Sequence, residues 1–115
     1  MKIGEVCLYT SDVVRLADFY RALLRVGEHS DDDVHQFILS EGTTLTIYND
    51  GTPRQGNHHN ISLAFTVEDV DVEFERVKAL GATIASLPML RPWGAKNMAF
   101  FDPDGNLVLF RSFQK

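Results

Sequence analysis

The segment ISLAFTVEDV, residues 61–70, decides the fold, because a similar pattern stands 57 residues earlier in GEVCLYTSDV, residues 4–13. In both segments an apolar residue recurs at every second position, as in a β-strand, and an aspartate that can cap a helix follows. A shift of 57 residues aligns seven pairs in one register: Val6 with Leu63, Leu8 with Phe65, Asp12 with Asp69, Val13 with Val70, Arg21 with Lys78, Ala22 with Ala79 and Leu23 with Leu80. Strand and helix signals that recur at a fixed period indicate a duplicated structural unit.

Each half of the chain predicts the order β-α-β-β, with a further short strand as an option. The first half predicts a strand at 3–9, a helix from 13 to 24 that Gly27 ends, and strands near 36–39 and 43–48. The second half predicts a strand at 61–67, a helix from 70 to 80 that Gly81 ends, and strands near 83–86, 97–101 and 107–110. Because both helices are apolar on one side, we expect them to cover one face of a sheet in an α+β fold. We expect a single domain, 1–115, made of one module over about 1–56 and another over about 57–115.

Composition and charge exclude several classes of protein. The chain has 115 residues, 44% of them hydrophobic and 23% charged, which is typical of a globular domain. The net charge of −5 argues against a nucleic-acid partner, because phosphate binding needs a basic surface. No apolar run approaches the ~18 residues of a membrane span, and residues 1–5 show no signal-peptide pattern, so we expect no membrane partner. The single cysteine, Cys7, excludes an internal disulfide and suits a reducing compartment, so we expect a cytoplasmic protein.

Three parts of the sequence carry a family resemblance. The segment RPWGAKNMAFFDPDGNLVLF, residues 91–110, resembles the closing stretch of the glyoxalase/bleomycin-resistance/dioxygenase superfamily, also called vicinal oxygen chelate proteins. The segments FTVEDVD (65–71) and KALGA (78–82), and Asp12 followed by Phe19 and Tyr20, resemble other parts of the family in the family's order. The resemblance implies two βαβββ modules that form a curved mixed sheet around a ligand-binding cup, with the helices on the outer face. It also implies that so short a chain forms a homodimer.

The resemblance also locates the positions where the family's enzymes hold a divalent metal on four side chains, usually His and Glu. These positions fall on Glu5, Thr46, Ser62 and Leu109. Leucine cannot ligate a metal, and Thr and Ser are poor neutral ligands, so only Glu5 has suitable chemistry. We therefore expect no metal, no cofactor and no catalytic residue. The alternative is a displaced metal site, in which His58 shares a strand face with Ser62 and pairs with Glu5.

The alternation of side chains along each strand predicts which of them line the cup. If Val6 and Leu8 pack on a helix, then Glu5, Cys7 and Tyr9 face the other way. The ligand-binding residues that we expect are Glu5, Phe37, Thr46, Tyr48, Ser62, Trp93, Leu109 and Arg111.

Several of these residues have a plainer alternative. Trp93 lies in a Pro/Gly loop at 87–95, where it can stack on a flat or cationic ligand, anchor a dimer, or simply pack on the core. For Phe37 and Tyr48 core packing is favoured, and for Glu5 exposure to solvent is an equal alternative. Cys7 is predicted to be a buried, inert thiol. The run Asp31-Asp32-Asp33 is predicted to be a solvated turn, with a cation-attracting rim as the alternative.

The predicted function is that of a metal-free binding protein. It sequesters a small, partly aromatic or cationic compound, and it is similar in this to the antibiotic-resistance members of the superfamily, which bind drugs without transforming them. The alternative is a metal-dependent lyase, isomerase or ring-cleaving dioxygenase, with a displaced metal site or with Glu5 as a general base. A regulatory module whose cup holds no ligand is a third possibility.

Overall fold

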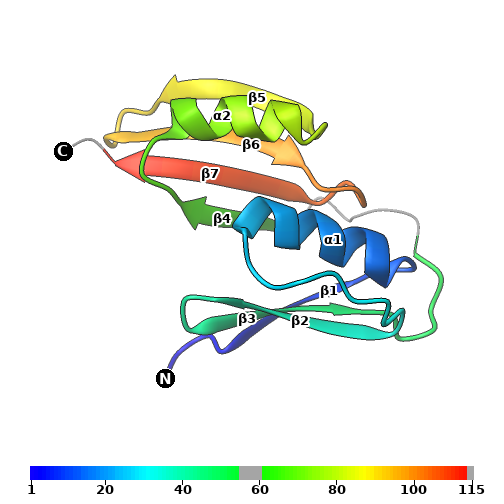
Figure 1. Ribbon diagram of the computed structural model, residues 1–115. Helices are drawn as coiled ribbons and strands as arrows, with labels where there is room; N and C mark the ends of the chain where they lie inside the picture. Colours follow the sequence, from blue (N-terminus) through cyan, green and yellow to red (C-terminus); the bar gives the residue numbers. More distant parts are fainter. Residues whose placement is uncertain (55–60, 114–115) are drawn as a thin grey trace. The chain divides into compact units, whose positions relative to one another are not determined.

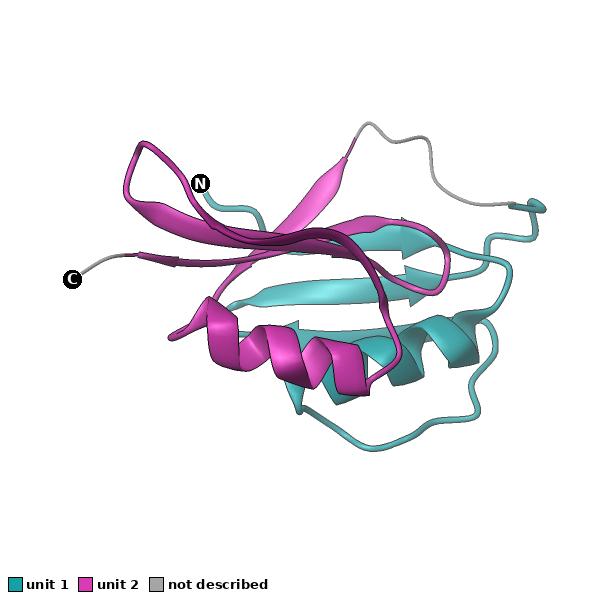
Figure 2. Ribbon diagram, turned by 90° about the horizontal axis from the view of Figure 1, so that it is seen from above, with its two compact units in different colours: residues 1–55 teal, residues 56–115 magenta. Residues whose placement is uncertain are grey.

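The computed structural model describes residues 1–54 and 61–113. The chain divides into two compact units, Met1–Gln55 and Gly56–Lys115 (Figure 2). The first unit contains β1 (Glu5–Tyr9), α1 (Val13–Leu24), β2 (His35–Ser40) and β3 (Thr43–Tyr48). The second contains β4 (Ser62–Thr66), α2 (Val70–Ala79), β5 (Thr83–Leu90), β6 (Ala95–Phe101) and β7 (Leu107–Phe113) (Figure 1). The predicted α+β class with two successive modules is confirmed, and the optional further strand is present in the second unit.

Each unit holds one sheet, and within both sheets the first and last strands are connected in the same way. In the first unit the strand order is β1-β3-β2, with β1 parallel and β2 antiparallel to β3. In the second unit the order is β4-β7-β6-β5, with β4 parallel to β7 and the other pairs antiparallel. The first strand of each unit therefore lies beside its last strand. A parallel pair cannot be joined by a tight hairpin, and in both units the intervening chain includes the helix.

The structure confirms the register of the 57-residue repeat. Strand β4 begins 57 residues after β1, and α2 begins 57 residues after α1. Both helices are capped by the aligned aspartates: the Asp12 carboxylate accepts a hydrogen bond from the Arg15 N–H, and that of Asp69 accepts from the N–H groups of Asp71 and Val72. These bonds satisfy backbone donors that a helix start leaves without partners.

The end of α1 differs from the prediction. The helix ends at Leu24 as predicted, but its cap is Arg25, which adopts the left-handed conformation with φ 56° two residues before Gly27. Gly27 also has a positive φ, of 71°, so the chain turns over two residues rather than at a single glycine. At Gly81 the prediction is confirmed, because that glycine follows the cap of α2 with φ 83°.

Each helix covers one face of its sheet. In the first unit α1 packs on β2 and β3, and the buried residues are Val13, Leu16, Ala17, Tyr20, Leu23, Ile38, Leu45 and Ile47. In the second unit α2 packs on β5, β6 and β7, and the buried residues are Val70, Val77, Ala95, Met98, Ala99, Phe100, Val108 and Phe110. Each large apolar side chain that is fully buried stabilises the fold by about 1.5–3 kcal/mol. The opposite face of each sheet carries the positions at which the sequence predicts binding residues.

The turn between β6 and β7 is built around one buried carboxylate. Asp102 accepts hydrogen bonds from the N–H groups of Asp104 and Asn106, at 2.9 and 2.8 Å, and from Asn106 Nδ2 at 2.8 Å. Gly105 has φ 83°, which glycine adopts without steric cost. The turn sets the pairing of Phe101 with Leu107 and thereby the register of the whole β6–β7 ladder.

Within the described part of the chain, no helix is long and apolar enough to cross a membrane.

Candidate functional site

The open face of the first sheet, opposite α1, carries three rows of side chains. Residues that are partners across neighbouring strands stand on the same face, because side chains alternate along each strand. The pairing of β1 with β3 and of β3 with β2 therefore aligns Glu5, Thr44 and Leu39; then Cys7, Thr46 and Phe37; and then Tyr9, Tyr48 and His35. The predicted positions Glu5, Phe37, Thr46 and Tyr48 thus share one face of one sheet.

Four rings on this face form an aromatic cluster, which consists of Tyr9, His35, Phe37 and Tyr48. The ring centroids of Tyr9 and Tyr48 are 5.9 Å apart, those of His35 and Tyr48 4.9 Å, and those of His35 and Phe37 4.2 Å. Phe37 is 56% exposed and Tyr9 47% exposed. The core packing favoured for Phe37 is therefore wrong, because residue 37 has the strand parity of the open face and not of the face that α1 covers. Tyr48 is half-buried within the cluster.

A charged pair borders the aromatic cluster. The Arg54 guanidinium lies over the Tyr9 ring, with its central carbon 4.8 Å from the ring centroid. Arg54 Nη2 donates to the Asp50 carboxylate at 2.7 Å. The Thr52 N–H and the Arg54 guanidinium hold the pKa of the Asp50 carboxyl below its ordinary value. The cation over Tyr9 is thus neutralised by a carboxylate, and this edge of the cluster carries little net charge.

Thr46 lies in the middle of the face and has an unsatisfied hydroxyl. It is 2% exposed, and its Oγ1 is buried without a hydrogen-bond partner among the described residues. An unpaired buried hydroxyl costs about 1–3 kcal/mol. Its row neighbour Cys7 is partly buried, and burial, followed by the nearby charge of Glu5, raises the pKa of the Cys7 thiol. A raised pKa keeps the thiol protonated and weakly nucleophilic, in agreement with the prediction of an inert cysteine.

The four positions that the resemblance assigns to a metal lie two in each unit. Glu5 and Thr46 share the open face of the first sheet, where Glu5 is one row away from Thr46. Ser62 and Leu109 share a face of the second sheet in the same relation, because Ser62 pairs with Leu107 and Ala64 with Leu109. Glu5 and Ser62 are exposed, Thr46 is buried and Leu109 is half-buried. The exposure of Glu5 removes any need for a buried cation to balance it.

The donor chemistry on these strands does not favour a metal. Over residues 1–54 and 61–113 there is no group of three or more His, Cys, Asp or Glu side chains that could hold a metal ion. Three of the four family positions hold Thr, Ser and Leu. His58, on which the displaced metal site depends, lies outside the described residues.

The open face of the second sheet carries a polar row at one end. Thr66, Arg111 and Asn97 are partners across β4, β7 and β6. Arg111 Nε donates to Thr66 Oγ1 at 3.1 Å, and the guanidinium lies 5.2 Å from the centroid of the Phe113 ring. The next row along the strands is small and aliphatic and consists of Ala64, Leu109 and Ala99. Arg111, which the alternation along its strand predicts to be a ligand-binding residue, thus forms a polar row with Thr66 and Asn97.

Trp93 lies in a shorter loop than the sequence predicts. Strand β5 runs on to Leu90 through two register shifts, so the loop is reduced to residues 91–94. The loop is closed by hydrogen bonds from the Arg91 N–H to the Ala95 carbonyl and from the Gly94 N–H to the Arg91 carbonyl. Trp93 is 68% exposed, which contradicts the alternative that it packs on the core of the chain.

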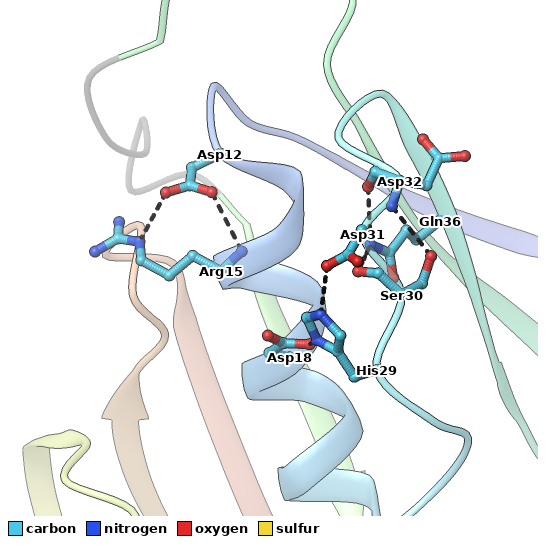
Figure 3. A network of polar contacts seen from close by, with 8 residues as sticks. All are labelled: Asp12, Arg15, Asp18, His29, Ser30, Asp31, Asp32 and Gln36. Atoms are coloured by element: carbon cyan, nitrogen blue, oxygen red, sulfur yellow. Dashed lines mark hydrogen bonds and ion pairs between the residues drawn. The ribbon is translucent and has the colours of Figure 1, made fainter.

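A polar network orders the loop that contains the acidic run (Figure 3). His29 lies between two carboxylates, with Nδ1 2.8 Å from Asp18 and Nε2 2.7 Å from Asp31. Asp32 accepts from the N–H groups of Val34 and His35, and the Gln36 amide donates to the carbonyls of Ser30 and Asp32. The turn is exposed as predicted, but two of its three carboxylates have local structural partners, which argues against a cation-attracting rim.

No ligand-binding role was assigned from the sequence to four members of these sets. His35 was not among the expected ligand-binding residues, although its two-residue spacing from Phe37 indicates that both share a face. Tyr9 and Thr66 follow the same alternation but were not among the expected ligand-binding residues. Asn97 has no sequence signal, because its place beside Arg111 follows only from the pairing of β6 with β7.

A comparison of the sequence with protein-family models places the chain in a known superfamily. Residues 2–110 match the model of the Glyoxalase/Bleomycin resistance protein/Dioxygenase superfamily, and the chain belongs to this superfamily. No curated protein matches the sequence significantly.

Solved structures share the fold at low sequence identity. The chain is similar to TioX from Micromonospora sp. ML1, with 23% identity, a TM-score of 0.77 and coverage of 99% of this chain and 100% of that one. It is similar to a glyoxalase/bleomycin resistance protein/dioxygenase from Nocardioides, with 21% identity, a TM-score of 0.80 and coverage of 100% and 85%. A lactoylglutathione lyase from Agrobacterium tumefaciens has 22% identity, a TM-score of 0.75 and coverage of 96% and 92%. These likenesses establish the fold.

Proposed function

We propose that this protein binds a small, partly aromatic compound on the open face of its first sheet and sequesters it without metal chemistry. The observation that carries the proposal is the aromatic cluster of Tyr9, His35, Phe37 and Tyr48, in which successive rings lie 4.2–5.9 Å apart. Aromatic side chains gain little from standing half-exposed on a sheet face unless something covers them. A planar ring laid on Phe37 and Tyr9 would bury their exposed faces.

The polar groups around the cluster would give such a ligand its orientation. Tyr9 and Tyr48, which carry hydroxyl groups, stand on this face, whereas the unpartnered Thr46 hydroxyl on the same face is buried. An apolar surface with a few polar groups is the usual composition of a small-molecule site. A cationic ring would also be accepted by the faces of Phe37 and Tyr48, so charged and neutral probes both belong in the test.

The metal-free part of the proposal rests on the chemistry of the four family positions. Leu109 has no donor atom, and Thr46 and Ser62 offer neutral hydroxyls. The competing function, a metal-dependent lyase, isomerase or dioxygenase, requires ligands from elsewhere in the chain. Elemental analysis of the purified protein separates the two. A stoichiometric metal that a chelator removes, together with an activity, would replace binding by catalysis.

We include a homodimer in the proposal, and the support is an apolar edge. Strand β5 is the edge strand of the second sheet, and Leu87, Met89 and Leu90 on it are exposed, as is Trp93 in the loop that follows. An exposed apolar edge strand is a surface on which a second chain can pair. Light scattering coupled to size exclusion tests this, and a monomer at micromolar concentration would contradict it. The cytoplasmic location stays a prediction that rests on the single cysteine.

The aromatic cluster is tested by a matched pair of variants. Phe37→Ala removes an exposed ring, and Leu39→Ala removes an exposed apolar side chain from the same strand and the same face. Stacking on an aromatic ring is worth about 0.5–1.5 kcal/mol, so Phe37→Ala should weaken binding of a planar probe by roughly 2- to 12-fold.

Calorimetric titration with 2-naphthol, acridine orange and 2-naphthoate provides the measurement. Leu39→Ala should leave each dissociation constant within about twofold, because it removes no aromatic face. Equal effects of the two variants, or no binding by any of the three probes, would contradict the proposed function.

A further inference from the structure

Arg111 stands on the open face of the second sheet in an arrangement that fixes its direction. Its Nε donates to Thr66 Oγ1 at 3.1 Å, and its guanidinium lies 5.2 Å from the Phe113 ring centroid. Thr66 is its partner on β4, and Asn97 its partner on β6. A guanidinium held at Nε and packed beside a ring loses less freedom when it binds a further group.

The positive charge of Arg111 is not neutralised by the chain. Within residues 1–54 and 61–113 no carboxylate forms an ion pair with it, whereas Arg76, Lys78 and Lys96 of the same unit each pair with a carboxylate, of Glu73, Glu75 and Asp71 respectively. The chain has 16 acidic residues against 11 Lys and Arg, so acidic partners are abundant. With Nε engaged by Thr66, the two Nη groups make no hydrogen bond to the described residues.

Asn97 adds a second unused polar group to the same row. Its Oδ1 is buried and has no hydrogen-bond partner among the described residues. A side-chain amide carries an acceptor and, in its NH2 group, two donors. The NH2 group of Asn97 makes no hydrogen bond to the described residues and is not one of their buried unpaired atoms, so it can donate to a molecule on the sheet face that Arg111 occupies.

The adjoining row determines what kind of molecule fits. Leu109 lies between Ala64 and Ala99 on the neighbouring strands, and Ala99 is buried while Leu109 is half-buried. Two alanines and one leucine form a flat apolar floor next to the polar row. The leucine that stands at a family metal position therefore supplies part of this floor.

We propose that Thr66, Arg111 and Asn97 form a subsite for the carboxylate of a small organic acid whose apolar body lies over Ala64, Leu109 and Ala99. The two Nη groups of Arg111 donate to the two carboxylate oxygens, Thr66 holds the guanidinium through Nε, and Asn97 donates from the side. One guanidinium matches the single charge and planar shape of a carboxylate, whereas a phosphate dianion would leave one charge without a partner. The inference rests on the proposed small-molecule function and adds a carboxylate subsite on the second sheet, within the second unit.

The test uses benzoate and its uncharged analogue benzamide at constant ionic strength. In protein labelled with ¹⁵N, benzoate should shift the Arg111 Nε–H and Asn97 NH2 resonances to saturation, and benzamide should not. Arg111→Gln should weaken benzoate binding by about tenfold or more. Arg111→Lys should also weaken it, because lysine keeps the charge but lacks the two parallel N–H donors of the guanidinium.

Lys78→Gln is the matched control, because it changes the net charge by the same amount on α2, which covers the other face of the sheet. It should leave benzoate binding unchanged. Equal weakening by Arg111→Gln and Lys78→Gln, or equal binding of benzoate and benzamide, would overturn the subsite. Tighter binding of inorganic phosphate than of benzoate would overturn its assignment to carboxylates. Amide spectra of each variant verify that it is folded.

The two proposals fail separately. If 2-naphthol does not bind but benzoate shifts Arg111, the aromatic cluster is refuted and the carboxylate subsite stands. If 2-naphthol binds in a manner that depends on Phe37 and benzoate leaves Arg111 unshifted, the reverse holds.

Discussion

Replacement of Thr46 by valine should stabilise the protein, although the residue stands at a family metal position. Thr46 is 2% exposed in the central strand of the first sheet, and its hydroxyl has no hydrogen-bond partner among the described residues. Valine keeps the branched shape and exchanges the hydroxyl for a methyl group. Because β-branched residues suit strands, the backbone of β3 gives no reason for a penalty.

The expected gain follows from the burial of Thr46. An unpaired hydroxyl in the protein interior costs about 1–3 kcal/mol, and its removal recovers that cost. Slight repacking around the larger methyl group offsets part of the gain, so we expect a net stabilisation of about 1–2 kcal/mol. For a chain of this length 1 kcal/mol corresponds to about 4 °C, so the melting temperature should rise by about 4–8 °C.

Urea and thermal unfolding followed by far-ultraviolet circular dichroism measure this change, because the signal includes the helix and strands of the unit that contains residue 46. Fluorescence is unsuitable, because the only tryptophan, Trp93, lies in the other unit. Thr44→Val is the control: Thr44 lies two residues earlier on the same strand and the same face but is only half-buried. Its hydroxyl is not one of the buried unpaired polar atoms, so its replacement should change the free energy of unfolding by no more than about 0.5 kcal/mol.

A destabilisation by Thr46→Val would refute the reasoning. It would mean that the hydroxyl is satisfied in solution, by an ordered water molecule or by a second chain. If the variant is stabilised and its affinity for an aromatic ligand also falls, the hydroxyl is kept for binding at the expense of stability.

Three further predictions concern single residues. Gly27→Ala should destabilise the protein by about 1 kcal/mol or more in urea unfolding, because alanine would be strained at φ 71° and its Cβ would lie 3.3 Å from Arg21 Nε. Gly4→Ala is the control and should leave stability unchanged, because no atom lies within 4 Å of the new Cβ. The hydrogen bond to Asp18, followed by the one to Asp31, raises the pKa of His29. The contribution of His29 to stability is therefore complete below about pH 6.5 and is lost as the pH rises through the raised pKa. His29→Gln should remove this pH dependence from unfolding curves measured across that range. Iodoacetamide should alkylate Cys7 more slowly than free cysteine at pH 8, since burial and then the charge of Glu5 raise its pKa, and an equal rate would contradict this.

Local patterns predicted the elements of this fold well. The alternation in residues 61–67 and the aspartates before each helix depend on neighbours in the sequence, and the structure reproduces β4 and α2 in the register of β1 and α1. The loop around Trp93 was predicted too long, because the Pro and Gly residues of 87–95 suggested an irregular segment. Strand β5 continues through Pro88 to Leu90 by shifting its register against β6.

The candidate site was predicted only in part. Strand parity placed Glu5, Thr46 and Tyr48 on one face, since period-2 alternation needs no knowledge of partners. Parity could not show that His35 would contact Tyr48, because that contact requires the order β1-β3-β2 and one particular antiparallel register. Nor could it show that the Thr46 hydroxyl would be buried without a partner.

The sequence alone determined that the chain contains two related strand–helix modules, and that three of the four metal positions of its superfamily hold side chains unsuited to a metal. The first conclusion follows from residue types and spacing, and the second from the resemblance to the superfamily together with the residue types at the positions that it implies; neither needs coordinates. Only the tertiary structure brought Tyr9 to Tyr48, and Arg111 to Thr66 over a separation of 45 residues. Those contacts depend on the pairing of distant strands, which the packing of a whole unit selects and which leaves no signal in the local sequence.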